Sequence, residues 1–523
     1  MTSFQKQALE PYGVVSDTDP LDVETEWTHV QNMRFNNLAA ESFGGIIEGT
    51  TLPVEPFHLQ FNGNHISPLW IYMGDGTIHV TDFTTDSDIT PAIIATSAKN
   101  WTSTLFNNFP VMNNEINAPY VWDNVTTNIA TPLPAFPANT ICKTIRPYRG
   151  FLVAMNITEG ADIQENRVIW SDLSDNGALP ASWDIADPTT LAGDNYLTQD
   201  RAEIIDGLAL RDFFVIYKTH SMILMRLTGG QGVMSFQKSQ VNSGLLAKNC
   251  VQEFNGKHFV VTDADVILFD GHNIESIADK RVRARIFTDI DVDNYRNSYT
   301  VRYDRQDEIW FIYPTTGQEL PNQAAVYNYK DNTWTFRDME AAAHTATGLA
   351  NFAISPTYDQ ATWTYDDIEA AVPYLPIANN PTTDTLITSA NLSGTYKLGI
   401  LDEGSTSFNG PLLTTLEKRS MTMGDEDVVK HIHSVIPKIS GQEGAIVGIE
   451  IGTQMFSGDE ITWSPIIDFE ISNIPTASAA HVQARQEAYF DVKGRYISIR
   501  FTCPKPWKLK GLYMKMGQSG SNY

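Results

Sequence analysis

Several segments of the chain carry side chains that could bind a metal ion. Residues 289–293 alternate Asp with apolar residues, as the first positions of an EF-hand calcium loop do. The sixth position of that loop would be Asn294, where Gly makes the sharp turn, and the twelfth would be Thr300, where Glu supplies two oxygens. His431 and His433 would share one strand face, but no third ligand lies near them in the sequence. We therefore expect no bound metal and no other cofactor.

Other segments resemble parts of enzyme active sites. The sequence of residues 40–44 resembles a nucleophile elbow. That motif needs a strand before the Ser, a helix after it and an α/β sheet. Residues 228–232 are rich in Gly, but neither Lys-Ser/Thr nor a helix follows, so we interpret them as a turn. The closest sialidase Asp-box, around Asp175 and Gly177, lacks its Ser/Thr and its Trp. Acidic residues 425–427 could supply paired carboxylates for sugar hydrolysis, yet solvated turns explain them better. We expect no catalytic residues and no enzyme.

A single dense basic run stands out between residues 280 and 286. The alternation places Arg281, Arg283 and Arg285 on one face of an expected strand and smaller apolar residues on the other. A solvated strand face is the simplest interpretation. The functional alternative is a contact with an acidic neighbouring subunit or with passing phosphate, through charge-assisted hydrogen bonds. These three arginines are therefore our candidate site, a basic strand at a subunit interface or facing a channel.

The elements that must position these side chains are strands. From about residue 57 onward, short β-branched and aromatic runs alternate with Gly, Asn, Asp and Pro, and no helical period is sustained. The clearest hairpin joins residues 259–262 to residues 266–269 and closes at residues 270–271. Both of its arms are continuously apolar, so both faces should be covered. The chain is predicted to be all-β.

A turn followed by an apolar strand recurs along the chain. It is present at residues 148–153, 210–217, 255–261 and 304–313, at intervals of roughly 45 to 60 residues. That spacing is close to the period of propeller blades, and radial repetition buries both faces of each small sheet. The pattern predicts a β-propeller of about five to seven blades.

The C-terminal portion follows a different pattern. Residues 447–451 and 497–501 alternate apolar with polar side chains, which is typical of strands with one wet face. A Gly-, Ser- and Asn-rich stretch at residues 404–410 precedes them. We therefore predict a propeller over residues 51–404 and a sandwich-like β platform over residues 405–523. Residues 356–390, with many Pro, Asp, Asn and Thr, predict a long loop or insertion in the propeller.

Composition limits the classes of partner. The 523 residues include 36 Lys and Arg against 62 Asp and Glu, a net charge of −26, which disfavours general affinity for nucleic acid or anionic lipid. The start of the sequence shows no secretory pattern, and no apolar run approaches the ~18 residues of a membrane span. Cys142, Cys250 and Cys503 lie far apart without metal-type spacing, so we predict buried thiols.

Four segments together resemble one protein family. Residues 24–39 contain an N-x-R-F strand at residues 32–35, followed by small residues and Gly. Residues 324–335 resemble an outer blade strand that ends in a turn and a Trp, and residues 461–464 and 494–501 resemble strands of a terminal β-domain. These segments are similar to the tail nozzle proteins of short-tailed bacteriophages, also called tail tubular protein B or stabilisation protein.

The resemblance implies an architecture and a function. The family pairs its propeller with a platform assembled from both chain ends, so residues 1–50 would join the C-terminal platform. It implies a homohexameric ring below the portal and the head-to-tail adaptor, with tail fibres or spikes docked nearby and double-stranded DNA passing through transiently. The protein would be synthesised in the host cytoplasm and reside in the tail of the virion. Ring closure needs a heterologous interface, to which Arg281, Arg283 and Arg285 would contribute.

Two other functions stay open from the sequence. The first is a carbohydrate-binding or depolymerising propeller of a phage tail, for which 11 Trp and 20 Tyr could supply stacking platforms. Most of these aromatic residues fall inside apolar runs, where the core needs them. The second is a receptor-binding protein without catalysis. Release of reducing sugar from host polysaccharide would identify the first function, and adsorption of the isolated chain to cells would identify the second.

Overall fold

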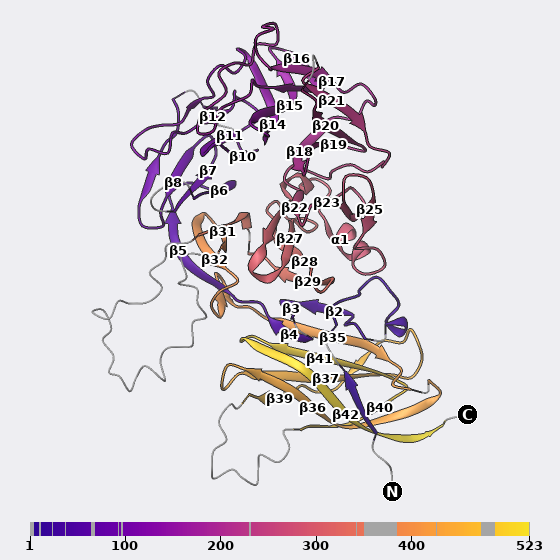
Figure 1. Cartoon of the computed structure of the whole chain (residues 1–523). Coiled ribbons are helices and arrows are strands. Elements are labelled where there is room, and N and C mark those ends of the chain that lie inside the picture. Colours follow the sequence, from indigo (N-terminus) through magenta and orange to yellow (C-terminus); the bar gives the residue numbers. More distant parts are fainter. Residues whose placement is uncertain are drawn as a thin grey trace.

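The computed structural model shows an all-β chain, in which a ring of small sheets lies above a two-sheet platform (Figure 1). The structure describes residues 5–521, apart from residues 10–11, 24, 37, 64–67, 93, 96–97, 230–231, 341, 350–383, 425 and 472–486. The loop or insertion expected at residues 356–390 lies outside the described residues as far as residue 383. The remainder of that segment belongs to strand β31 (Thr385–Leu392).

Seven four-stranded antiparallel sheets, counted over the described residues, form the ring. The first four blades are β6–β9 (His58–Asn62, Leu69–Met73, Ile78–Thr81, Asp86–Asp88), β10–β13 (Thr102–Phe106, Phe109–Asn113, Tyr120–Val121, Thr131–Pro132), β14–β17 (Thr140–Tyr148, Phe151–Glu159, Asp162–Trp170, Gly193–Tyr196) and β18–β21 (Ile204–Leu210, Phe213–Lys218, Met222–Leu227, Met234–Lys238). The last three are β22–β25 (Val251–Phe254, Lys257–Val261, Val266–Phe269, Ile274–Ser276), β26–β29 (Tyr299–Tyr303, Glu308–Tyr313, Gln323–Asn328, Thr333–Asp338), and β30–β32 (Ala342–Gly348, Thr385–Leu392, Thr395–Leu401) with β5 (Ile46–Leu52).

The sheets close into a β-propeller. The first strand of each sheet lies beside the first strand of the next, and β30 of the seventh sheet lies beside β6 of the first. Strand β5 precedes the first blade in the chain, yet it pairs with β32 as the outer strand of the last blade. The predicted all-β propeller is thus confirmed, with seven blades.

The recurring turns of the sequence are equivalent positions in successive blades. Each joins the first strand of a blade to its second strand, as in the hairpins Tyr148↔Phe151 and Leu210↔Phe213. Arg149 and Arg211 at these turns adopt positive φ values of 47° and 52°, which lets a two-residue loop follow the strand twist. Neighbouring blades cover both faces of the second strands, and every residue of β27 is buried, which explains its apolar run Ile309–Tyr313.

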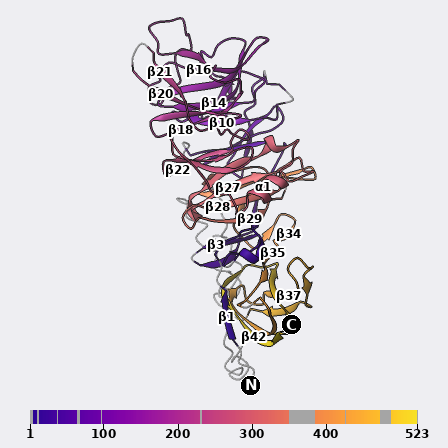
Figure 2. The ribbon, with the colours of Figure 1, turned by 90° about the vertical axis from the view of Figure 1, so that its right-hand side faces the viewer.

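The platform consists of two six-stranded sheets built from both ends of the chain (Figure 2). One contains β1 (Gln5–Leu9), β3 (Met33–Asn36), β4 (Ala39–Ser42), β36 (Val428–Gly441), β40 (Ala488–Gly494) and β42 (Trp507–Ser521). The other contains β2 (His29–Gln31), β35 (Thr414–Met421), β37 (Ile446–Gln454), β38 (Thr462–Trp463), β39 (Ile467–Glu470) and β41 (Tyr496–Cys503). A short hairpin, β33 (Thr406–Ser407) and β34 (Gly410–Pro411), connects the ring to the platform. All three cysteines are buried free thiols, as predicted.

The strand predicted over residues 280–286 is wrong. Residues Arg283–Asp289 form α1, the α-helix of the described chain. Val282, Ile286 and Ile290 recur every fourth residue and are all buried, so helical spacing places them on one face against the core. The alternation of Arg with smaller residues suggested a strand because the run was too short to separate the two periods.

Candidate functional site

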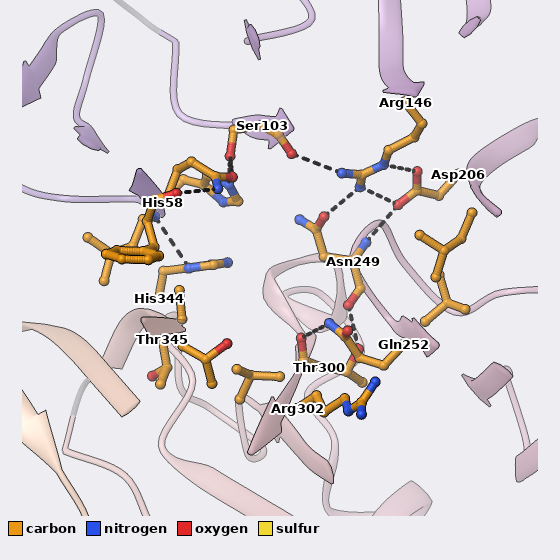
Figure 3. Close-up of a pocket in the computed structure, with 18 of the residues that line it drawn as sticks. His58, Ser103, Arg146, Asp206, Asn249, Gln252, Thr300, Arg302, His344 and Thr345 are labelled. Atoms are coloured by element: carbon orange, nitrogen blue, oxygen red, sulfur yellow. Dashed lines mark hydrogen bonds and ion pairs between the residues drawn. The ribbon is translucent and has the colours of Figure 1, made fainter. Parts of the chain in front are cut away.

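A polar cavity of about 260 Å³ lies on the axis of the propeller (Figure 3). The first strands of the blades run along this axis, so every blade contributes side chains to its wall. These are His58 from β6, Ser103 from β10, Arg146 from β14, Asp206 from β18, Gln252 from β22, Arg302 from β26 and His344 from β30.

An ion pair between neighbouring blades crosses one wall of the cavity. Arg146 donates from Nε and Nη2 to the two carboxylate oxygens of Asp206, at 2.9 and 2.7 Å. The backbone N–H groups of Gly207 and Asn249 donate to the same oxygens at 2.8 and 3.0 Å. Burial disfavours the charged form of Arg146, but the attraction of the Asp206 carboxylate, hydrogen bonds included, is larger than this effect of burial and raises the pKa of the guanidinium. The pair is therefore a charge-balanced, bidentate contact that ties β14 to β18.

His58 and Ser103 resemble a catalytic base and nucleophile, but their hydrogen bonds run the other way. The Ser103 hydroxyl donates to Gln60 Oε1 at 2.7 Å, so its oxygen accepts from His58 Nε2 at 2.8 Å. Burial, with the nearby His344 ring and Arg146, lowers the pKa of His58 well below its usual value. The ring is thus a neutral donor and has no lone pair directed at the hydroxyl. This pair positions side chains and does not activate a nucleophile.

His344 presents a donor to the open centre of the cavity. The backbone N–H of Leu59 donates to His344 Nδ1 at 3.3 Å, so the proton of the neutral ring is on Nε2. Burial lowers the pKa of His344 to about 3. Its ring stacks on Tyr299 at a centroid distance of 4.4 Å and contacts the tilted ring of His58 at 4.2 Å. In Figure 3 the free edge of the His344 ring points into the cavity.

A second cavity of about 170 Å³ adjoins the first at one mouth of the axis. His58, Asn249 and His344 line both cavities. The outer wall contains three basic residues and one acidic residue, Lys99, Lys248, Arg296 and Glu319.

Two of the three predicted site arginines lie near the start of α1. Arg281 lies in the turn before the helix, and Arg283 lies on its first turn. Arg281 Nη1 donates at 3.0 Å to the backbone oxygen and to Oδ1 of Asn332. Arg283 pairs with Asp279 at 3.1 Å, and its side chain keeps 46 % of its surface exposed. Neither lines the axial cavity.

Arg285 packs inside the molecule. Its Nη2 donates to Gln31 Oε1 at 2.9 Å, and its guanidinium lies 3.6 Å from the centre of the Phe336 ring. The carboxylate of Asp17 accepts from the backbone N–H groups of Ala284 and Arg285 at 2.6 and 3.2 Å. Arg285 thus connects the propeller to the N-terminal segment of the same chain, and Arg283 is the most exposed of the three.

A buried charge network lies between the platform and the propeller. Arg34 of β3 contacts Asp402 at 2.6 Å and Glu308 of β27 at 3.2 Å, and Arg337 of β29 contacts Asp402 at 3.5 Å. None of the four side chains is more than 6 % exposed. Burial raises the pKa of Glu308 to about 7, assisted by Asp402 and opposed by Arg34. Two guanidinium groups and two acidic side chains make up this network, which is called the junction network below.

The other sequence candidates have structural roles. The Asp291 carboxylate accepts from the backbone N–H groups of Asp293, Asn294 and Gly317, so it caps a turn where a calcium loop was considered. Ser42, the serine of residues 40–44, accepts from the backbone N–H of Trp507 and joins β4 to β42. Part of residues 228–232 and of residues 425–427 lies outside the described residues. Within the described residues, no group of three or more His, Cys, Asp or Glu side chains is placed to hold a metal ion.

Sequence reasoning missed the axial cavity entirely. Its polar residues occur singly on seven strands, from His58 to His344, and no local motif marks them. Arg34 was singled out only as part of the N-x-R-F resemblance, with no role attached. A usable signal was the presence of polar residues on first strands that are otherwise apolar, such as Asp206 in β18.

Comparisons with known proteins assign this chain to no family. No family model matches it, and no curated protein matches its sequence. Among solved structures, the AfRom2 CNH domain is similar at 8 % identity and a TM-score of 0.35, over 68 % of this chain and 96 % of that chain. YCF48 bound to D1 peptide is similar at 10 % identity and a TM-score of 0.32, over 58 % of this chain and 87 % of that chain. No helix in the described residues is long and apolar enough to cross a membrane.

Proposed function

We propose that this protein is a structural subunit of the tail of a short-tailed phage, and that copies of it form a nozzle ring through which DNA leaves the virion. The observation that carries the proposal is the interlocked path of the chain. β1 to β4 belong to the platform, β5 closes the propeller, and the chain returns to the platform only after all seven blades. The protein acts mechanically in this proposal, without catalysis.

The junction network supports a stiff subunit. Arg34 reaches from the platform to Glu308 in the sixth blade and to Asp402 after the seventh, and all three are buried. Moving the platform away from the propeller would separate these charges inside a region of low dielectric, which costs several kcal/mol per ion. A subunit of a ring that bears the force of DNA ejection needs this kind of resistance to bending.

The charge of the chain supports passage of DNA without retention. A net charge of −26 repels phosphate over much of the surface, so few favourable contacts would hold a duplex in the channel of the ring. The axial cavity of a single propeller, at about 260 Å³, is far too small for DNA. The DNA channel would therefore lie between subunits, around the axis of the ring.

Ring closure sets a requirement for the subunit surface. One patch of each subunit must contact a different patch of the next. Arg283, with 46 % of its side-chain surface exposed, is the predicted arginine that can still contribute to such a contact. The ring would lie below the portal and the adaptor, with tail fibres or spikes nearby.

Light scattering and averaged electron images of the purified full chain test the proposal. We expect a ring of about six copies with an axial hole, assembled alone or on the phage adaptor protein. A chain that stays monomeric both alone and with the adaptor would contradict the proposal. Release of reducing sugar from host polysaccharide by that monomer would instead favour the depolymerising propeller.

A further inference from the structure

We infer that the axial cavity of the propeller is a binding site for a small oxyanion, either a phosphate or a carboxylate. The inference does not depend on the proposed nozzle function. It rests on the hydrogen-bonding groups that line the cavity, on their directions and on the charges at its mouth.

The first donor directed into the cavity is His344 Nε2–H. Leu59 N–H donates to Nδ1, which places the ring proton on Nε2, and no hydrogen bond among the described residues uses that proton. The side chain is buried, with 8 % of the residue exposed, and its ring is clamped between His58 and Tyr299. This N–H faces the open space of the cavity, where an acceptor oxygen of a ligand could receive its hydrogen bond.

The second donor is the side-chain amide of Asn249, on the opposite side of the open centre (Figure 3). Arg146 Nη2 donates to Asn249 Oδ1 at 2.7 Å, and a guanidinium cannot accept, so the amide orientation is fixed with Nδ2–H₂ turned toward the cavity. Asn249 has φ = 62°, a left-handed conformation that Asn and Asp tolerate best among non-Gly residues.

The acceptors of Asp206 and the backbone oxygens of Asn249 and Thr300 are already used. Each oxygen of Asp206 accepts two hydrogen bonds, one from Arg146 and one from a backbone N–H. The backbone oxygen of Asn249 accepts from both the N–H and the hydroxyl of Thr300, and the oxygen of Thr300 accepts from Gln252. Around Asn249 the wall therefore offers donors to a ligand, which suits an oxyanion.

The mouth of the cavity adds positive charge. Lys248 pairs with Glu115, and the Glu203 carboxylate attracts Arg296 from beyond ion-pair distance, whereas Lys99 has no carboxylate within ion-pair distance among the described residues. Glu319 is the one acidic residue of this wall, so the mouth keeps an excess of positive charge in a chain of net charge −26. Such a local excess would draw anions toward the axis.

Isothermal titration calorimetry on the full chain, at constant ionic strength, tests the inference. Inorganic phosphate, succinate and glucose serve as probes of a phosphate, a carboxylate and a neutral polyol. We expect saturable one-to-one binding of phosphate or of succinate, and the tighter of the two identifies the natural group. Glucose should give no saturable heat.

Two variants locate the binding in the cavity. Asn249→Asp keeps the contact with Arg146 and the backbone conformation but replaces the donor with a negative charge, so anion binding should weaken about tenfold or more. Asn255→Asp, at an exposed hairpin turn with φ = 49°, adds the same charge outside the cavity and should bind as the wild type does. His344→Phe retains the stacked ring without Nε2–H and should also lose affinity, which keeps the test decisive if Asn249→Asp does not fold.

Three results would overturn the inference. One is the absence of saturable binding of either anion at millimolar concentration. Another is binding of glucose as tight as that of the anions. The last is anion binding unchanged in a folded Asn249→Asp or His344→Phe variant.

Discussion

Burial favours neutral rings for three histidines of the propeller, and two of them, His258 and His344, also accept a hydrogen bond at Nδ1 that a second proton would disrupt. His258 joins two blades: Tyr217 donates to its Nδ1 at 2.7 Å, and its Nε2 donates to the oxygen of Ala209 at 2.9 Å. Burial lowers the pKa of His258 to about 4, and it lowers the pKa values of His58 and His344 as well.

Acid should therefore destabilise the propeller through His258. Its pKa falls from 6.5 to about 4 on folding, so the stability it contributes is full above pH 6.5 and is lost as pH falls toward 4. Between pH 7 and pH 5 this residue should cost the wild type about 2 kcal/mol of unfolding free energy. Urea denaturation at both pH values should show a smaller loss in His258→Gln, whereas exposed His272→Gln should behave as the wild type. An equal pH dependence in His258→Gln would exclude this role.

The arginines around α1 should differ sharply in their effects on stability. Arg285→Ala removes the bond to Gln31 and the contact with the Phe336 ring, so we expect a loss of about 2 kcal/mol of unfolding free energy. Arg283→Ala removes an exposed pair with Asp279 and should change it by less than about 0.5 kcal/mol. Chemical denaturation of the two variants measures this contrast. Equal effects would mean that Arg285 is not a structural link.

Strand β5 is the element on which ring closure depends. It pairs with β32 in the last blade, although it precedes the first blade in sequence. Gly44 and Gly45 carry the chain from the platform into β5, directly beneath the segment that leaves the seventh blade. Gly45 N–H donates to Gly404 O at 3.1 Å, and Asp402 N–H donates to Gly45 O at 2.9 Å. The segment that enters β5 and the segment that leaves the seventh blade cross here, and the space between their backbones does not admit a side chain at Gly44 or Gly45.

Gly45→Ala should consequently disturb ring closure. A Cβ atom at this position would lie 2.1 Å from the backbone oxygen of Thr406, which cannot move aside as a flexible side chain would. We expect a loss of at least about 2 kcal/mol of unfolding free energy, measured by urea denaturation. Gly232→Ala, with nothing within 4 Å of its Cβ, is the matched control and should be nearly neutral. A Gly45→Ala protein as stable as this control would show that the crossing is loosely packed.

The whole molecule behaves as one body if the junction network holds. Asp402 is its central carboxylate, because it contacts Arg34 and Arg337 and accepts from the backbone N–H of Gly44 at 2.9 Å. The propeller and the platform are thus joined by buried charges in addition to the strands that pass between them.

Asp402→Asn should uncouple the two parts. The substitution keeps the shape and the left-handed backbone but leaves two buried arginines short of one negative charge, which should cost about 3 to 5 kcal/mol. Calorimetry should show a lower midpoint, with the platform and the propeller melting separately. Asp212→Asn, at an exposed pair with Arg149, should stay within about 0.5 kcal/mol of the wild type. One unshifted transition in Asp402→Asn would contradict this role of the network.

The class of fold could be predicted from the sequence, because strand patterns and turn chemistry are local. The recurring turns, such as the one at Arg149 and Gly150, marked equivalent hairpins of successive blades, and continuous apolar runs such as Ile309–Tyr313 signalled strands covered on both faces. Local patterns failed where the signal was short, as at residues 280–286, where four-residue spacing of buried side chains produced a helix.

The axial cavity and the junction network, in contrast, arise from contacts between distant parts of the chain. His344 and Asn249 are far from His58 in the sequence and meet because seven first strands converge on one axis. Arg34, Glu308 and Asp402 likewise meet because the chain leaves the platform, circles the ring and returns. Such contacts depend on ring closure, a long-range property that no window of the sequence contains, so their residues carry no local signature.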